Sequence, residues 1–299
     1  MTTVGMKRGI GGFIFDAANQ IFVVLFALTI IYPFWTTIML SFSPMNEANS
    51  LGFKVWINDW SISAYKYAFS RYGNMGVAYA NSIFRTIIGT ASALVFALCA
   101  AYPLSKKTIP GRSFLTILIL ITMFFSGGII PQYLLIRKLG LVNSRAVLIL
   151  PNLVIGFHII IMRNFLMTID DAYEEAALMD GANYIQILLR IMIPLSKPVI
   201  ATITLWMAVF HWNEWFQALI FITDRDKLVL QMLLRKMIQE MEAIMSNDIA
   251  TFEILEEIEM PTAALQAAIT ILTIGPIVLF YPFLQRYFVK GIFIGSLKG

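Results

Sequence analysis

The sequence predicts an all-α membrane protein, and three observations support this prediction. The chain is 59% hydrophobic and only 13% charged, whereas a soluble domain carries about 25% charged residues. Its mean hydropathy is +0.76. Its apolar residues are gathered in long runs that polar connections separate. These features indicate helices in a lipid bilayer, because a helix satisfies its own backbone hydrogen bonds there.

Six apolar runs are long enough to cross a bilayer. A spanning helix needs about 20 predominantly apolar residues. Several runs contain proline or glycine, which membrane helices tolerate because neighbouring helices re-satisfy the freed backbone groups. We therefore expect a single transmembrane domain over residues 1–299, with spans at approximately 20–42, 86–104, 114–136, 146–162, 199–222 and 262–283.

Charge alone gives two conflicting indications of orientation. If both chain ends lie on one side, the 22 Lys and Arg residues divide equally between the sides, so the positive-inside rule does not decide. The short loop with Lys106, Lys107 and Arg112 favours termini inside, whereas the basic loop Arg137–Arg145 argues against it. On the short loop and the basic amino terminus, we expect cytoplasmic termini.

The composition excludes several function classes. One cysteine, Cys99, cannot form a disulfide framework. The net charge of +4 is scattered over loops, which does not indicate nucleic-acid binding. No phosphate loop, metalloprotease motif or catalytic triad spacing is present. The two histidines, His158 and His211, lie on different spans, so we expect no metal site. We expect a protein that is not an enzyme and binds no cofactor itself.

A polar break from Asp170 to Pro198 interrupts this apolar pattern between the fourth and fifth spans. Asp171 can cap a short helix, with Glu174 three residues later completing a capping-box-like pair. Asp171, Glu174 and Glu175 would then stand at the helix start, where the macrodipole favours negative charge. We expect a short surface helix that begins here.

The rest of this break predicts the end of the short helix and a second helix after it. Ala176 and Ala177 keep one face flat, and Gly181 ends the first helix as a C-cap glycine does. The second helix has Tyr184, Ile187, Leu188 and Ile191 on one face. Such a unit favours docking of another protein, although an interfacial loop packed on lipid headgroups has the same pattern.

The spacing in this break resembles a known motif. Glu175-Ala176-Ala177, three residues, Gly181, nine residues, Ile191, one residue, Ile193 and Pro194 resembles the E-A-A-x3-G-x9-I-x-L-P loop of bacterial ABC importer permeases. Ile193 departs from the pattern by replacing leucine, and Asp170 stands where many relatives carry proline. The segments Ser126–Pro131, His211–Phe216 and Pro282–Gly291 also resemble carbohydrate permeases.

The resemblance is to the maltose-type carbohydrate importers, in their oligosaccharide branch, and it covers roughly the whole chain. It implies a six-span permease fold with a cytoplasmic coupling helix in the loop 163–197, and import by alternating access. It also implies that the ATPase-coupling residues are Glu174, Glu175, Ala176, Ala177, Asp180, Gly181 and Pro194.

The same resemblance implies a heteromeric complex in the bacterial inner membrane. Its other members would be a second homologous permease, a dimeric cytoplasmic ATPase and an extracytoplasmic solute-binding protein. ATP and Mg would be bound by the ATPase and not by this chain. Because the loop at Glu175 must then be cytoplasmic, both termini are expected on the cytoplasmic side.

Glu214 is an acidic residue inside the fifth predicted span. A charge at a helix centre costs about 2.5–3.5 kcal/mol, so its carboxylate should face a partner or a wet cavity. One hypothesis places a polar and aromatic set on the sugar path, because hydroxyl-rich ligands suit such groups. The alternative is that these residues hydrogen-bond other helices. The candidates are His211, Asn213, Glu214, Trp215 and Gln217.

Two other function classes are open to the sequence. An ion-coupled secondary transporter would use Glu214 and His211 as a proton relay. A membrane-embedded enzyme acting on lipid-linked sugars would need paired carboxylates, and Asp170-Asp171 is better explained by helix capping. The motifs do not specify the sugar, its length or its charge. The arginines that we place in loops are weak evidence for an acidic sugar, and they are Arg85, Arg137 and Arg145.

Overall fold

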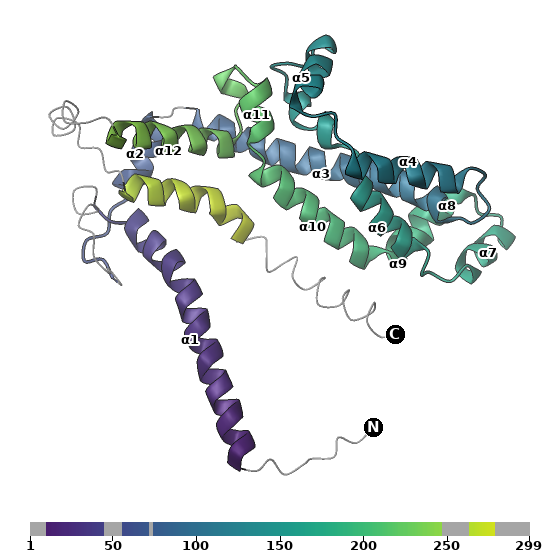
Figure 1. The fold of residues 1–299 in the computed structure, drawn as a ribbon, viewed down its shortest axis with the longest axis horizontal. Coiled ribbons are helices and arrows are strands. Elements are labelled where there is room, and N and C mark those ends of the chain that lie inside the picture. Colours follow the sequence, from purple (N-terminus) through teal and green to yellow (C-terminus); the bar gives the residue numbers. More distant parts are fainter. Residues whose placement is uncertain (1–9, 45–55, 72–73, 247–262, 279–299) are drawn as a thin grey trace. The chain divides into compact units, whose positions relative to one another are not determined.

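The computed structural model describes residues 10–44, 56–71, 74–246 and 263–278. Within these ranges every regular element is helical and no residue lies in a β-strand (Figure 1). The chain forms two compact units. One comprises Met1–Arg71 and Glu240–Leu272, and the other comprises Tyr72–Gln239 and Thr273–Gly299.

The first unit contains the long helix α1 (Ile10–Ser41) and the short helix α2 (Ser63–Arg71). Helix α1 is long and apolar enough to cross a membrane, and most of its large apolar side chains are exposed. Its end is tied to α2 because the hydroxyl of Tyr65 donates to Ser41 Oγ at 2.9 Å. An exposed apolar helix of this kind suits lipid as its surroundings.

The second unit is built around α3 (Met75–Ser105), which packs against α6 (Gly156–Leu166) and α10 (Lys197–Asn213). Small residues recur at every fourth position of α3, on one face of the helix. Such residues let helix backbones approach closely. The small set is Gly89, Ala93, Ala97 and Ala101, and the buried α10 side chains at the same spacing are Val199, Ile203, Met207 and His211.

Several expected spans are bent rather than straight. Over 114–136, α4 (Arg112–Phe124) and α5 (Ile129–Lys138) meet at 111°. The break contains Gly128 with φ +82°, a conformation that side chains with a Cβ disfavour. Over 146–162, two 3₁₀ turns, η1 (Arg145–Leu148) and η2 (Leu150–Asn152), precede α6 at 50°.

The number of spans depends on how bent helices are counted. Two described helices, α1 and α3, are long and apolar enough to cross a membrane, and the number rises to five if each bent pair forms one span. A shorter apolar helix covers Ala263–Val278. The remainder of the expected span 262–283 lies outside the described residues.

A second cluster lies beyond the end of α10. It joins α5 and η1 to α11 (Phe216–Phe221), to the residues that follow η4 (Arg225–Lys227) and to the first turn of α12 (Leu230–Ser246). Asn143 fastens it, because its Oδ1 accepts from the backbone N–H groups of Thr223 and Asp224 at 3.3 and 3.0 Å. Asn81 of α3 donates to the carbonyls of Asp226 and Leu228.

Candidate functional site

The segment in which we expect the ATPase-coupling residues, called the coupling segment below, runs from α7 (Ala172–Met179) through α8 (Tyr184–Ile187) to α10. Asp171 holds the N-cap position of α7 but makes no side-chain cap, since its backbone is already helical at φ −61° and ψ −22°. Instead, Asp170 Oδ1 accepts from the N–H of Ala172 at 3.0 Å. The prediction that Asp171 and Glu174 form a capping pair is therefore wrong.

The Glu174 side chain does not cap the start of α7, because it is paired with Lys106. The carboxylate is buried and accepts a hydrogen bond from the Nζ of Lys106, the residue that ends α3. Burial lowers the pKa of the Lys106 ammonium, and the charge of Asp171 opposes this shift. The ion pair fastens α7 to the end of α3.

The end of α7 is a Schellman motif. The N–H of Ala182 donates to the carbonyl of Ala177, and the N–H of Gly181 donates to Leu178, both at 3.0 Å. Gly181 has φ +81°, which confirms the expected C-cap glycine. Ala177 is buried, whereas Glu175, Ala176 and Asp180 are exposed.

The next helix begins with a capping box that our sequence reasoning missed. Asn183 Oδ1 accepts from the N–H of Gln186, and Gln186 Oε1 accepts from the N–H of Asn183, each at 2.9 Å. The N-x-x-Q spacing carries this signal. Ile187 is fully buried, as expected for the apolar face of this helix. Tyr184, which we placed on the same face, is 60% exposed.

The path from α8 to the membrane helix is continuous but bent. A π-helical turn, η3 (Leu188–Met192), and the short α9 (Ile193–Leu195), which carries the exposed Pro194, come after α8. The run Tyr184–Leu195 then meets α10 at 82°.

The coupling segment also presents large apolar side chains outward. Exposed side chains of this kind in one patch commonly mark a protein interaction site. They are Tyr173, Leu178, Met179, Tyr184 and Ile185, with Met179 88% exposed.

A second polar site lies at the break between α10 and α11. Glu214 leaves the helix with an extended backbone at φ −77° and ψ 118°. Arg85 of α3, which is 0% exposed, donates through Nη1 to the Glu214 carbonyl at 2.6 Å and through Nη2 to the Glu214 carboxylate at 2.5 Å. Its Nη2 also donates to Gln217 Oε1 at 3.0 Å.

Glu214 also caps α11, because its Oε1 accepts from the N–H of Gln217 at 2.9 Å. The break is thus held by an ion pair in which both terminal nitrogens of Arg85 donate hydrogen bonds, whereas its buried Nε has no partner. We placed Arg85 in a loop, but it lies inside α3, which begins at Met75 rather than at residue 86. The spacing of Asn81 and Arg85, on one helix face, is the signal that could have revealed this.

The five candidate path residues fall into two groups. His211 and Gln217 are buried, and Glu214 is held by Arg85. Asn213 is exposed and Trp215 is partly exposed.

Two side chains of α12 lie over this accessible pair. The guanidinium carbon of Arg235 lies 3.8 Å from the centroid of the Trp215 ring. Gln231 Nε2 is 3.4 Å from Asn213 Oδ1. The structure therefore brings an amide, an indole and a guanidinium together at the break.

Comparison with known proteins agrees with this architecture. A family model described as "Binding-protein-dependent transport system inner membrane component" matches residues 12–294. Protein LplC of Bacillus subtilis is 39% identical over 292 residues, which is 96% of each chain. A B. subtilis polygalacturonan/rhamnogalacturonan transport system permease protein, YtcP, is 37% identical over 96% of this chain and 99% of its own.

A solved structure shows the same likeness in three dimensions. It is a chain from the crystal structure of a bacterial ABC transporter involved in the import of the acidic polysaccharide alginate. The TM-score is 0.83 at 33% identity, covering 95% of this chain and 99% of that chain. The ion-coupled alternative gains no support from these likenesses. The chain belongs to the family of binding-protein-dependent transport system inner membrane components, as a multi-pass subunit that is not an enzyme and works with a separate ATPase and a solute-binding protein.

Proposed function

We propose that this chain is a permease subunit of an ATP-driven, binding-protein-dependent importer of oligosaccharides. It has six spans in one domain over 1–299, with cytoplasmic termini, and forms half of a path that works by alternating access. The other half comes from a second homologous permease, and a dimeric cytoplasmic ATPase binds the ATP and Mg. The full-length likeness to carbohydrate permeases supports this proposal.

The observation that carries the proposal is the construction of the coupling segment. Glu174 and Ala177 face inward and hold α7 to α3, while the opposite side of the segment is exposed. That outer side contacts the ATPase through its apolar patch, and Gly181 and Pro194 set the geometry of the two bends. The exposed acidic members of the coupling set are Glu175 and Asp180, with the small Ala176 exposed between them.

The sugar path uses the accessible side of the α10–α11 break. Asn213 and Trp215 contact the saccharide, because amides bind hydroxyls and an indole stacks on a sugar face. His211, Glu214 and Gln217 do not contact the saccharide. They stabilise the conformation of the α10–α11 break, and their burial and hydrogen bonds support this role.

The saccharide class that this site fits is acidic. Arg235 stacks on Trp215, and guanidinium groups bind carboxylates with two parallel hydrogen bonds. Among the described residues, no carboxylate lies within 4.0 Å of the Arg235 guanidinium. The names of two similar proteins refer to polygalacturonan/rhamnogalacturonan and to the acidic polysaccharide alginate.

Uptake by the reconstituted complex tests this function. Proteoliposomes that hold the complex and its binding protein should import an oligogalacturonate with ATP inside, and should do so without a proton gradient. Replacing Arg235 by Gln should lower acidic uptake about tenfold, since one charge-assisted contact is worth about 1.4 kcal/mol or more. R225Q, at an exposed arginine of η4, is the matched control. Uptake that follows a proton gradient without ATP would refute the proposal.

Association with the ATPase tests the coupling segment separately. M179Q should release the ATPase during purification, because Met179 is the most exposed apolar side chain of the patch. L139Q changes an apolar residue that is 59% exposed at the end of α5 and should leave assembly intact. Equal retention of the ATPase by both variants would contradict the docking role.

A further inference from the structure

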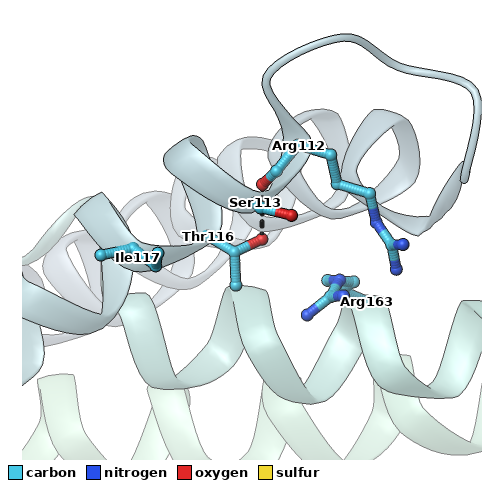
Figure 2. A pocket seen from close by; sticks show the side chains of 5 residues that line it. All are labelled: Arg112, Ser113, Thr116, Ile117 and Arg163. Carbon is cyan, nitrogen blue, oxygen red and sulfur yellow. Dashed lines mark hydrogen bonds between the residues drawn. The ribbon is translucent and has the colours of Figure 1, made fainter.

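A cavity lined by two arginines lies between the start of α4 and the end of α6. Its volume is about 200 Å³, far more than the ~30 Å³ share of one water molecule. Figure 2 shows the side chains of Arg112 and Arg163 directed into one space, with hydroxyl-bearing residues beside them. The lining residues are Arg112, Ser113, Thr116, Ile117 and Arg163.

A shared hydrogen-bond acceptor holds the guanidinium groups of Arg112 and Arg163 close to each other. Arg112 Nε and Arg163 Nε donate to the same acceptor, the carbonyl of Leu104, at 2.9 and 3.1 Å. That carbonyl belongs to the last turn of α3, where the helix dipole favours cations. Arg112 Nη2 also donates to Met167 Sδ at 3.1 Å, and both arginines line the same pocket.

This pair of positive charges is uncompensated. Among the described residues, no Asp or Glu oxygen lies within 4.0 Å of either guanidinium. Two like charges at such a separation repel. An anion between them would turn the repulsion into attraction, and tetrahedral phosphate oxygens fit the guanidinium geometry.

The surroundings distinguish a lipid from a soluble anion. Helix α4 has no buried residue, and its apolar side chains form an exposed surface that continues from the cavity. A headgroup in the cavity would thus leave its acyl chains against this surface. The exposed apolar side chains are Phe114, Leu115, Ile117, Leu118 and Ile121.

The position also fits the membrane surface. The cavity lies at the same end of α3 as the Lys106–Glu174 ion pair, which is the cytoplasmic end in the proposed orientation. Anionic lipids are enriched in the cytoplasmic leaflet, and basic pockets between helices on that side bind their headgroups. We propose that Arg112 and Arg163 form a binding site for the phosphate of an anionic phospholipid of the inner leaflet, an inference that rests on the proposed topology.

Native mass spectrometry of the purified complex tests this site. The complex is stripped of lipid and titrated with dioleoyl-phosphatidylglycerol, with dioleoyl-phosphatidylcholine as the zwitterionic reference. The wild type should retain phosphatidylglycerol selectively. R112Q/R163Q should bind it about twenty-five-fold more weakly, at about fivefold for each arginine near the membrane surface. R137Q/R145Q, which removes two exposed arginines elsewhere, should bind it like the wild type.

Several outcomes would overturn the lipid site. Equal phosphatidylglycerol binding by R112Q/R163Q and wild type would do so, as would complete displacement by inorganic phosphate, which would indicate a soluble anion. Binding to the isolated chain that vanishes on assembly would show that a partner's acidic side chain fills the cavity. If the double variant fails to assemble, the single variants R112Q and R163Q give the comparison, each with an expected loss of about fivefold. Because lipid binding is measured without transport, its failure is distinguishable from a failure of sugar uptake.

Discussion

Gly89 marks the closest approach of two helices in the second unit. A Cβ at this position would lie 2.5 Å from Nε2 and 2.7 Å from Cε1 of the His211 ring. Real Cβ atoms do not approach other heavy atoms so closely, so the buried His211 ring or the two helices would have to move.

We therefore expect G89A to destabilise the protein by about 1–3 kcal/mol, the usual cost of overpacking. Thermal unfolding of the purified complex in detergent measures this. Gly76 lies in the same helix with nothing within 4 Å of its Cβ position, so G76A should unfold at or slightly above the wild-type temperature. Restoration of stability in G89A/H211A would identify the ring as the cause, whereas equal behaviour of G89A and G76A would contradict the close contact.

Arg85 and Glu214 illustrate a different residue-scale effect. Their ion pair is buried, with 0% and 13% of the side chains exposed. Removing one partner of such a pair leaves a buried charge without compensation, which costs about 3–5 kcal/mol.

R85M should therefore lower the unfolding temperature strongly, and R85M/E214M should recover part of the loss, because two apolar groups leave no isolated charge. Arg137 is exposed at the end of α5, and R137M should change the stability by less than about 0.5 kcal/mol. A double variant that is less stable than R85M would argue against the pair as the source.

At the scale of elements, the end of α7 gives a test of the coupling segment. Gly181 has φ +81°, and a Cβ there would meet nothing within 4 Å. An alanine would thus bring only backbone strain, of roughly 1–2 kcal/mol. Gly140 has φ +69° and equally open surroundings, so G140A imposes similar strain on a different loop.

We expect G181A to lower the ratio of sugar transported to ATP hydrolysed, because the strain loosens the Schellman motif between α7 and α8. G140A should lose comparable stability and keep the ratio of sugar transported to ATP hydrolysed. Hydrolysis assays on both variants, scaled to the amount of folded complex, make the comparison. If G140A uncouples transport to the same degree, the effect is general instability.

The sequence predicted some elements well and others poorly, for physical reasons. Gly181 was predictable as a helix end because few other residues adopt a positive φ. The bend between α4 and α5 was not predictable, since a straight helix and a broken one have the same apolar pattern. In the structure, Gly128 with its positive φ lies at this bend. Arg85 was assigned to a loop because a polar residue in a long buried helix resembles a boundary until its partner, Glu214, is placed.

At the scale of the whole second unit, α3 and α10 should move as one body. The small-residue face of α3, the Gly89–His211 contact and the Arg85 hydrogen bonds all join the same two helices. Packed interfaces of this kind switch between discrete arrangements rather than deform smoothly.

Spin labels at Ile87 of α3 and Phe210 of α10, which are 60% and 37% exposed, should keep one distance with and without ATP. The exposed native Cys99 is replaced by alanine first. Electron paramagnetic resonance on the complex measures the distance. A distribution that shifts on ATP binding would contradict the single-body behaviour.

The His211 ring occupies the space above Gly89, where a Cβ would lie 2.5 Å from its Nε2. This contact opposes sliding of α3 past α10. In the proposed complex, we therefore expect the seam that opens and closes to lie between this subunit and the second permease. ATP hydrolysis would drive relative motion of two stiff halves, and an isolated copy of this chain should show no nucleotide-dependent change of shape.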